Sequence, residues 1–129
     1  MHCLDTSTLI SIFDGDEDIV RKLEEISSSS VSITPIILCE LYKGAAHANV
    51  TEKRLDFIKR LLRAVELLPL SENACSIFGT DYLQLKEKGA IIKDNDLMIA
   101  SICKAHNATL ITRDSKDFGK VKDLKFEVW

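Results

Sequence analysis

The sequence has little of what marks a membrane protein or a secreted one. No stretch approaches the ~20 consecutive apolar residues that a membrane-spanning helix requires. The first residues, Met1 to Asp5, lack both the basic start and the apolar core of a signal peptide. We therefore expect a cytoplasmic protein that does not contact a membrane.

Cysteine is scarce as well, with four residues in a chain of 129. No two cysteines form a CxxC pair, and no histidine stands beside one at the spacing of a zinc finger. Each cysteine lies in an apolar stretch, which favours a reduced, small side chain in the core over a disulfide or a metal ligand. The four positions are Cys3, Cys39, Cys75 and Cys103.

An excess of positive charge is also missing, because the formal net charge is −3. This does not indicate a protein that holds nucleic acid through a globally basic surface, so any such contact has to be local or assisted by bound cations. The composition, 46% hydrophobic and 29% charged, is that of an ordinary globular protein. Its length suits one core and not two, so we expect a single domain over residues 1–129.

Apolar residues recur at spacings of three and four in several stretches, which is the pattern of amphipathic helices. Thr34 and Ser71 precede two of these helices as N-cap residues, and Pro35 suits a first helical position. Gly89 and Asn107 suit the left-handed conformation at a helix end. The predicted helices cover approximately residues 16–27, 35–47, 51–62, 71–89 and 96–106, and the serines at 27–30 form a loop.

Short apolar runs between the helices predict strands. The clearest is 108–112, and others are expected in a short run ending at Leu4 and at 31–33, 65–68 and 126–129. Strands that alternate with helices along the whole chain predict an α/β fold with a largely parallel sheet. In such sheets ligands bind at the carboxyl ends of the strands, so that edge is where we expect the chemistry.

Acidic residues occupy comparable places along this pattern. Asp5 follows the first strand, Asp96 begins a helix, and Asp114 and Asp117 follow the strong strand, while Glu40 interrupts an otherwise apolar helix. Carboxylates gathered in one crevice repel one another unless a cation compensates their charge. No histidine is placed to join them, so their oxygens suit Mg²⁺ or Mn²⁺ better than zinc.

Taken singly, each acid also has an ordinary interpretation. Asp5 could cap a turn, and Asp94 or Asp96 could cap the helix that follows. Glu40 could lie on the exposed side of its helix, and the two acids after the strong strand could be surface turn residues. Spacing alone leaves these alternatives open.

The order of these segments resembles the PIN-domain family, and within it the VapC-type toxin ribonucleases of toxin–antitoxin (VapBC) systems. The segments span nearly the whole chain at the family's usual separations. They are Leu4-Asp5-Thr6-Ser7, Ile33-Thr34-Pro35, Glu40-Leu41-Tyr42-Lys43-Gly44, Asn95-Asp96-Leu97-Met98-Ile99-Ala100, Ala108-Thr109-Leu110-Ile111-Thr112-Arg113-Asp114, Asp117-Phe118 and Trp129.

The resemblance implies a three-layer α/β/α fold with a central, mainly parallel sheet of four or five strands. It also implies an endoribonuclease site that depends on Mg²⁺ or Mn²⁺. Asp5, Glu40 and Asp96 fall on the family's three acidic positions, and Asp5 with Asp96 are its usual direct metal ligands. Asp117, acting through water, is slightly favoured over Asp114 as the fourth acid.

Further expectations follow from the resemblance. Thr6 has a supporting place beside the site, the substrate is RNA, and the partners are a small VapB-like antitoxin and a second copy of the chain in a homodimer. The basic residues near the acids could contact RNA phosphates, with ordinary surface charge as the alternative. They are Lys43, Lys93, Arg113 and Lys116.

Two rival functions remain at this point. A PIN-fold module could bind RNA or protein without cleaving, but such a module is expected to have a broken acidic set, and this set is intact. A phosphatase-type domain with an acidic pocket would need a second acid two residues after Asp5, where Ser7 stands. Which RNA is cut does not follow from the sequence.

Overall fold

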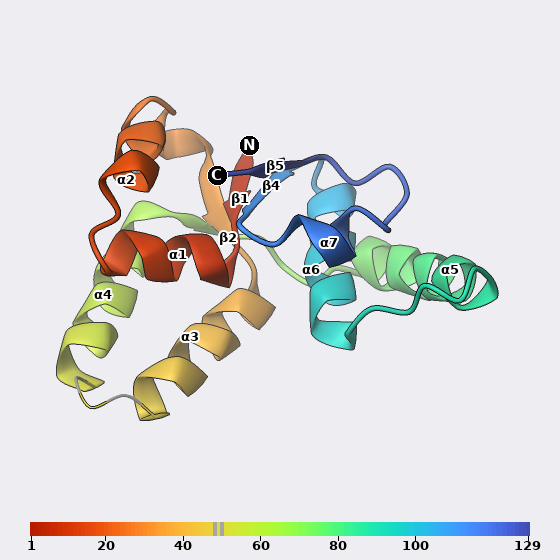
Figure 1. Cartoon of the computed structure of the whole chain (residues 1–129), viewed down its shortest axis with the longest axis horizontal. Coiled ribbons are helices and arrows are strands. Elements are labelled where there is room, and N and C mark those ends of the chain that lie inside the picture. Colours follow the sequence, from red (N-terminus) through yellow and green to blue (C-terminus); the bar gives the residue numbers. More distant parts are fainter. Residues whose placement is uncertain (48, 50) are drawn as a thin grey trace.

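The computed structural model describes residues 1–47, 49 and 51–129, and places a five-stranded sheet between two groups of helices (Figure 1). All strand pairs are parallel, and the order across the sheet is β3-β2-β1-β4-β5. The strands are β1 (His2–Leu4), β2 (Val31–Ile33), β3 (Glu66–Leu67), β4 (Thr109–Thr112) and β5 (Phe126–Val128). The predicted α/β class and the parallel sheet are confirmed.

The helices form the outer layers of the molecule. In Figure 1, α1, α2 and α4 lie on one side of the sheet and α5, α6 and α7 on the other, while α3 extends from the end of β2. Their bounds are α1 (Thr6–Phe13), α2 (Glu17–Glu24), α3 (Pro35–His47), α4 (Thr51–Ala64), α5 (Glu72–Glu87), α6 (Asp94–Ala105) and α7 (Ser115–Phe118). None of the helices in the described part of the chain is long and apolar enough to cross a membrane.

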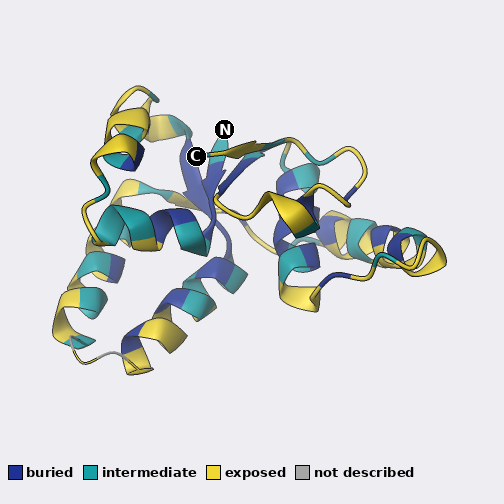
Figure 2. Ribbon diagram, viewed as in Figure 1, coloured by how far each residue is buried: buried dark blue, intermediate teal, exposed yellow. Residues whose placement is uncertain are grey.

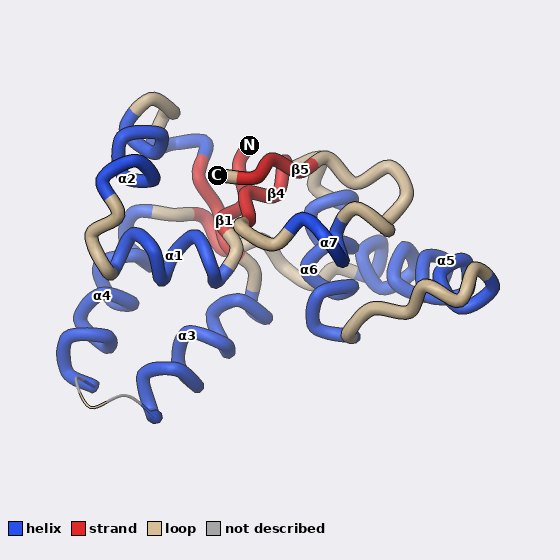
Figure 3. Tube along the Cα trace, in the orientation of Figure 1, coloured by secondary structure: helices blue, strands red, loops and turns tan. Residues whose placement is uncertain are grey.

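The strands lie in the middle of the molecule, between the helices (Figure 3). The strands β1, β2 and β4 form its buried core (Figure 2). Strands of a parallel sheet are covered on both faces, which is why β2 is buried at every position. Leu4, Ile33, Leu110 and Ile111 bring apolar side chains into this core. The polar side chain of Thr8 is also buried there, and its hydroxyl donates to the Ile111 carbonyl at 3.1 Å.

Local capping sets several helix ends as the sequence predicts. The N–H of Ile37 donates to the Thr34 hydroxyl at 3.2 Å, and the N–H of Ala74 donates to the Ser71 hydroxyl at the same distance. After α5 and α6, Gly89 and Asn107 take φ angles of 64° and 52°. These left-handed residues turn the chain away from the helix axis.

Some element boundaries differ from the predictions. Helix α6 begins at Asp94, two residues earlier than expected, and its N-cap position is Lys93. The capping role for Asp94 or Asp96 is therefore wrong, because both acids lie in the first turn. The serine tract contains a 3-10 turn over Ser28–Ser30, and neither α1 nor α7 is among the predicted helices.

The expectation of four core cysteines holds for two of them. Cys3 and Cys103 are buried, but Cys39 and Cys75 are exposed. The two exposed residues lie in α3 and α5. Each residue of an α-helix is turned by about 100° from the last, so an apolar neighbourhood in sequence does not decide which face a side chain takes.

Candidate active site

The sequence-predicted acids gather at the carboxyl ends of β1 and β4. The strand order reverses at β1, because the chain builds β2 and β3 on one side of it and then β4 and β5 on the other. At such a point the loops that follow neighbouring strands separate and leave a crevice. Leu4 is in register with Ile111, so the residues after β1 and β4 leave the sheet side by side.

Asp5 is the most buried of these acids. It is the N-cap of α1, where its Oδ1 accepts from the Thr6 N–H at 2.9 Å. Its Oδ2 accepts from the Thr112 hydroxyl at 2.7 Å, which ties β1 to the end of β4. Burial raises the pKa of Asp5, the bonds from Thr112 and Thr6 lower it, and the charge of Asp114 raises it again, with a net rise.

Glu40 reaches the same place from the second turn of α3. Burial raises the pKa of its half-buried carboxyl, and the negative charges of Asp5 and Asp96 raise it further. Its Oε1 and the Thr6 Oγ1 are both buried without a hydrogen-bond partner in the described structure. The Thr6 hydroxyl nevertheless lies near enough to lower the Glu40 pKa, although the two groups do not meet hydrogen-bond geometry.

Asp96 enters from the first turn of α6. Its pKa is raised by burial, and then by the charges of Asp5, Asp117 and Asp114 in that order. The pKa of Asp96 is therefore raised by acids that follow β1 and by acids that follow β4. The five predicted acids form one electrostatically connected group and do not lie on separate surfaces.

The two candidates for the fourth acid take different positions on α7. Asp114 is its N-cap and accepts from the Lys116 N–H at 3.2 Å. Asp117 lies in the helix, and its Oδ1 pairs with the Lys120 ammonium at 3.2 Å. Asp117 has the larger effect on Asp96, whereas Asp114 acts on both Asp5 and Asp96. The structure brings both acids to the site.

Two of the predicted basic residues act on the acids. Lys43 lowers the pKa of Glu40, and Lys93 lowers the pKa of Asp96. Both lysines are exposed, so their ammonium groups stand at the rim of the site and remain open to solvent.

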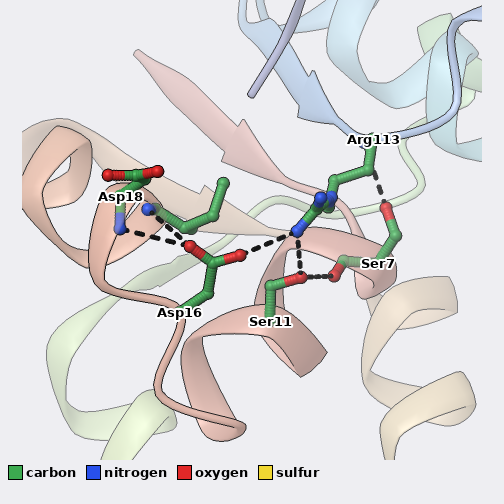
Figure 4. Close-up of polar contacts among 6 residues, drawn as sticks. Ser7, Ser11, Asp16, Asp18 and Arg113 are labelled. Atoms are coloured by element: carbon green, nitrogen blue, oxygen red, sulfur yellow. Dashed lines mark hydrogen bonds and ion pairs between the residues drawn. The ribbon is translucent and has the colours of Figure 1, made fainter.

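Sequence reasoning missed a network around Arg113. The guanidinium donates to the Ser11 hydroxyl and pairs with Asp16, residues of α1 and of the turn after it (Figure 4). The interacting residues are about 100 positions apart, so no local pattern could have indicated the contact.

The geometry also bears on metal binding. Within residues 1–47, 49 and 51–129, no group of three or more His, Cys, Asp or Glu side chains is arranged to hold a metal ion. The negative charges of the acids repel one another. In the described part of the chain, the buried Oε1 of Glu40 also has no hydrogen-bond partner. Such a group can attract a cation or hold a proton, because either change relieves the repulsion.

Comparison with known proteins gives a family and close structural relatives. The model of the PIN domain family matches residues 2–124. The ribonuclease VapC2 of Rickettsia felis is 30% identical over 131 aligned positions, which cover 100% of this chain and 98% of the relative. The tRNA(fMet)-specific endonuclease VapC of Salmonella typhimurium is 25% identical over 98% of this chain and 96% of its own length.

Solved structures resemble the fold closely. The VapBC2 complex of Rickettsia felis, bound to a DNA fragment from its promoter, has a chain with a TM-score of 0.92 and 28% identity, covering 99% of this chain and 98% of that one. VapBC-1 of nontypeable Haemophilus influenzae gives a TM-score of 0.88 and 29% identity, with coverage of 99% and 97%.

Proposed function

Because the chain belongs to the PIN-domain family, we propose that it is a VapC-type endoribonuclease that hydrolyses RNA phosphodiester bonds with the help of Mg²⁺ or Mn²⁺. The observation that carries the proposal is the meeting of Asp5, Glu40 and Asp96, each with a raised pKa. Burial and mutual repulsion disfavour three charged carboxylates at one place. Ionisable groups with pKa values perturbed in this way are concentrated at functional sites. The similarity to ribonucleases over the full chain supports the same conclusion.

The donor chemistry fits a hard divalent cation. Mg²⁺ is usually bound through one or two carboxylates, with water filling its remaining positions. Three converging ligands are therefore not required. Asp5 and Asp96 are the proposed direct ligands, and Glu40 with Asp117 or Asp114 would act through water. When bound, the cation would make a water molecule more acidic and stabilise charge on the leaving oxygen.

The chain's own residues would hold and polarise the substrate. The Thr112 and Thr6 bonds fix the direction of the Asp5 carboxylate. Glu40, which lies close enough to Asp5 and Asp96 to interact with their charges, would take a proton from the attacking water. Lys43 and Lys93 stand where they can contact the flanking phosphates. The products would carry a 5′-phosphate and a 3′-hydroxyl, with no covalent enzyme intermediate.

The test is an RNA cleavage assay with the purified chain. We expect cleavage with Mg²⁺ or Mn²⁺, none with EDTA, and a loss of kcat on the order of 100-fold or more in Asp96→Asn. Asp94→Asn is the matched control, because Asp94 is an exposed acid in the same helical turn. Cleavage that persists in EDTA would reject the metal-dependent site. RNA binding without cleavage would favour the non-catalytic PIN module instead.

The proposal includes an antitoxin partner. An apolar groove of ≈ 590 Å³ runs between α1, α2 and α4, with β1 and β2 also contributing to it. Leu23 of α2 and Ile26, two residues after that helix, line it, as do Phe57 and Leu61 of α4, with Glu24 and Arg60 among the lining residues as the charged exceptions. This combination fits the apolar side of a partner segment. The VapBC complexes that match the fold support an antitoxin as the occupant, and the predicted homodimer stays a prediction.

A further inference from the structure

A network of polar contacts joins the segment after β4 to α1 and to the turn that follows it (Figure 4). From these contacts we propose that Arg113 is a positioning residue: held by Ser11 and Asp16, it keeps the segment Thr112–Asp114 in the place that the acidic site needs. The inference rests on the proposed ribonuclease function. We call Arg113, Ser11 and Asp16 the Arg113 network.

The contacts of the guanidinium are specific. One nitrogen, Nη1, donates to the Ser11 Oγ at 2.9 Å and to the Asp16 Oδ2 at 3.0 Å. The side chains of Arg113 and Asp16 are 45% and 35% exposed, so solvent weakens this ion pair and it adds little to overall stability. Its consequence is geometric, because it joins two segments on either side of the crevice.

The backbone of Arg113 leads directly to the acids. Its N–H donates to the Ser7 Oγ at 3.2 Å, and the Ser7 hydroxyl lies 3.5 Å from the Asp5 Oδ2. The preceding residue, Thr112, orients Asp5 through its hydroxyl. The following residue, Asp114, is itself an acid of the site, and its N–H donates to the Thr112 Oγ1 at 3.0 Å. A shift of residue 113 would therefore move the support of one acid and the backbone of another.

Asp16 is suited to hold Arg113 because its two carboxylate oxygens have separate partners. Oδ1 caps α2 by accepting from the N–H groups of Asp18 and Ile19 at 3.2 and 3.3 Å, and Oδ2 is left for Arg113. Gly15, with a φ of 80°, makes the turn that brings Asp16 back towards β4. The network thus depends on a turn that only a left-handed residue allows.

The experiment compares kcat and KM in Arg113→Gln, Asp16→Asn and the control Arg21→Gln. Asparagine is also a good N-cap, so Asp16→Asn removes the charge and keeps the cap of α2. Arg21 is an exposed arginine on α2 that forms an ion pair with Asp18 of the same helix. We expect Arg113→Gln to lower kcat by roughly 10- to 100-fold with KM changed less than about two-fold, since small displacements of reacting groups reduce rates to this extent. Arg21→Gln should leave both unchanged.

The double variant Arg113→Gln with Asp16→Asn tests whether the residues act as one unit. If they do, its kcat equals that of Arg113→Gln, because removing either partner already breaks the pair. If the fold-losses of kcat in the two single variants instead multiply in the double variant, the proposal is overturned. So would an unchanged kcat in Arg113→Gln, or a raised KM with normal kcat, which would make Arg113 an RNA-binding residue instead.

A second measurement does not depend on cleavage. Amide hydrogen exchange of Arg113 and Asp114 should be faster in Asp16→Asn than in the wild type and unchanged in Arg21→Gln, because both amides donate within the segment that the network holds. Equal exchange in all three proteins would refute the positioning role. If the wild type does not cleave RNA, the proposed function fails, and this exchange result still decides whether Arg113 holds the segment.

Discussion

Asp96 illustrates, at the scale of single residues, how a site can oppose the stability of its own fold. Its carboxyl is half-buried and close to three other acids, which together raise its pKa above the ordinary value of 3.8. The unfolded chain does not bring these charges together. At neutral pH the charged form is therefore less favourable in the folded chain than in the unfolded one.

The sign of this linkage gives a pH prediction. The destabilisation by Asp96 is complete above its folded pKa, falls as the pH drops towards the ordinary value of 3.8, and disappears below that value, where the side chain is protonated in both states. Without metal, Asp96→Asn should therefore raise the melting temperature by a few degrees at pH 7. The gain should shrink steadily towards pH 4. Thermal unfolding in EDTA across this range measures the effect.

Asp94→Asn is a control for which we expect a change in stability of the opposite sign. Asp94 is exposed at the start of α6, where a negative charge interacts favourably with the helix dipole. Its removal should lower stability slightly, by a few tenths of a kcal/mol. If both variants destabilise the chain equally at pH 7, repulsion at Asp96 is not the dominant effect and the electrostatic account of the site is wrong.

At the scale of elements, α5 and α6 are joined by a buried ion pair. The Lys104 ammonium lies 2.7 Å from the Asp81 Oδ2, and the two side chains are only 16% and 8% exposed. Removing one partner of such a pair leaves an uncompensated charge in a poorly solvated place. The pair therefore acts as a constraint on how the two helices pack.

Lys104→Met tests this constraint. We expect it to lower the free energy of unfolding by about 3 kcal/mol, because Asp81 is left without its partner. Arg60→Met, which breaks the exposed pair of Arg60 with Asp56, should change it by less than about 1 kcal/mol. Urea unfolding of both variants gives the comparison. Equal losses would mean that burial of the Lys104 pair has no special consequence.

The elements also show what the sequence could and could not predict. Thr34, Pro35 and Asn107 act through their own backbone neighbours, so they predicted helix ends correctly. Helix α7 was missed because its four residues are too few to show a period. The capping interpretation of Asp96 failed because position within the first turn depends on where the helix begins, and helix starts are set by tertiary contacts as well as by local signals.

The acids were predicted for a different reason. Asp5 directly follows β1 and Asp114 stands two residues after the end of β4. Neighbouring parallel strands end at one edge of the sheet, so topology alone brings the two acids together. The Arg113 network has no such signal. Ser11, Asp16 and Arg113 look like ordinary surface residues until the fold places the α1–α2 turn beside the end of β4.

At the scale of the whole molecule, two surfaces lie on either side of α1. Its N-terminus carries Asp5 at the acidic site, while Leu9 and Ile12 line the apolar groove that continues to α2 and α4. Helix α2 begins at the Asp16 cap, so it is connected both to the groove and to the Arg113 network. A partner in the groove would therefore contact the same helices that support the site.

The apolar groove predicts that an antitoxin binds to and stabilises the isolated chain. We expect a small protein encoded by a gene next to the gene of this chain to bind the chain. At a concentration of 100 times the Kd, the partner should raise the chain's free energy of unfolding by about 2.7 kcal/mol. Leu61→Gln, in the groove, should weaken binding about ten-fold or more, because burial of a leucine side chain contributes on that scale. Leu83→Gln, on the exposed face of α5, is the matched control and should bind normally. Calorimetric titration measures both, and equal affinities would place the partner on another surface.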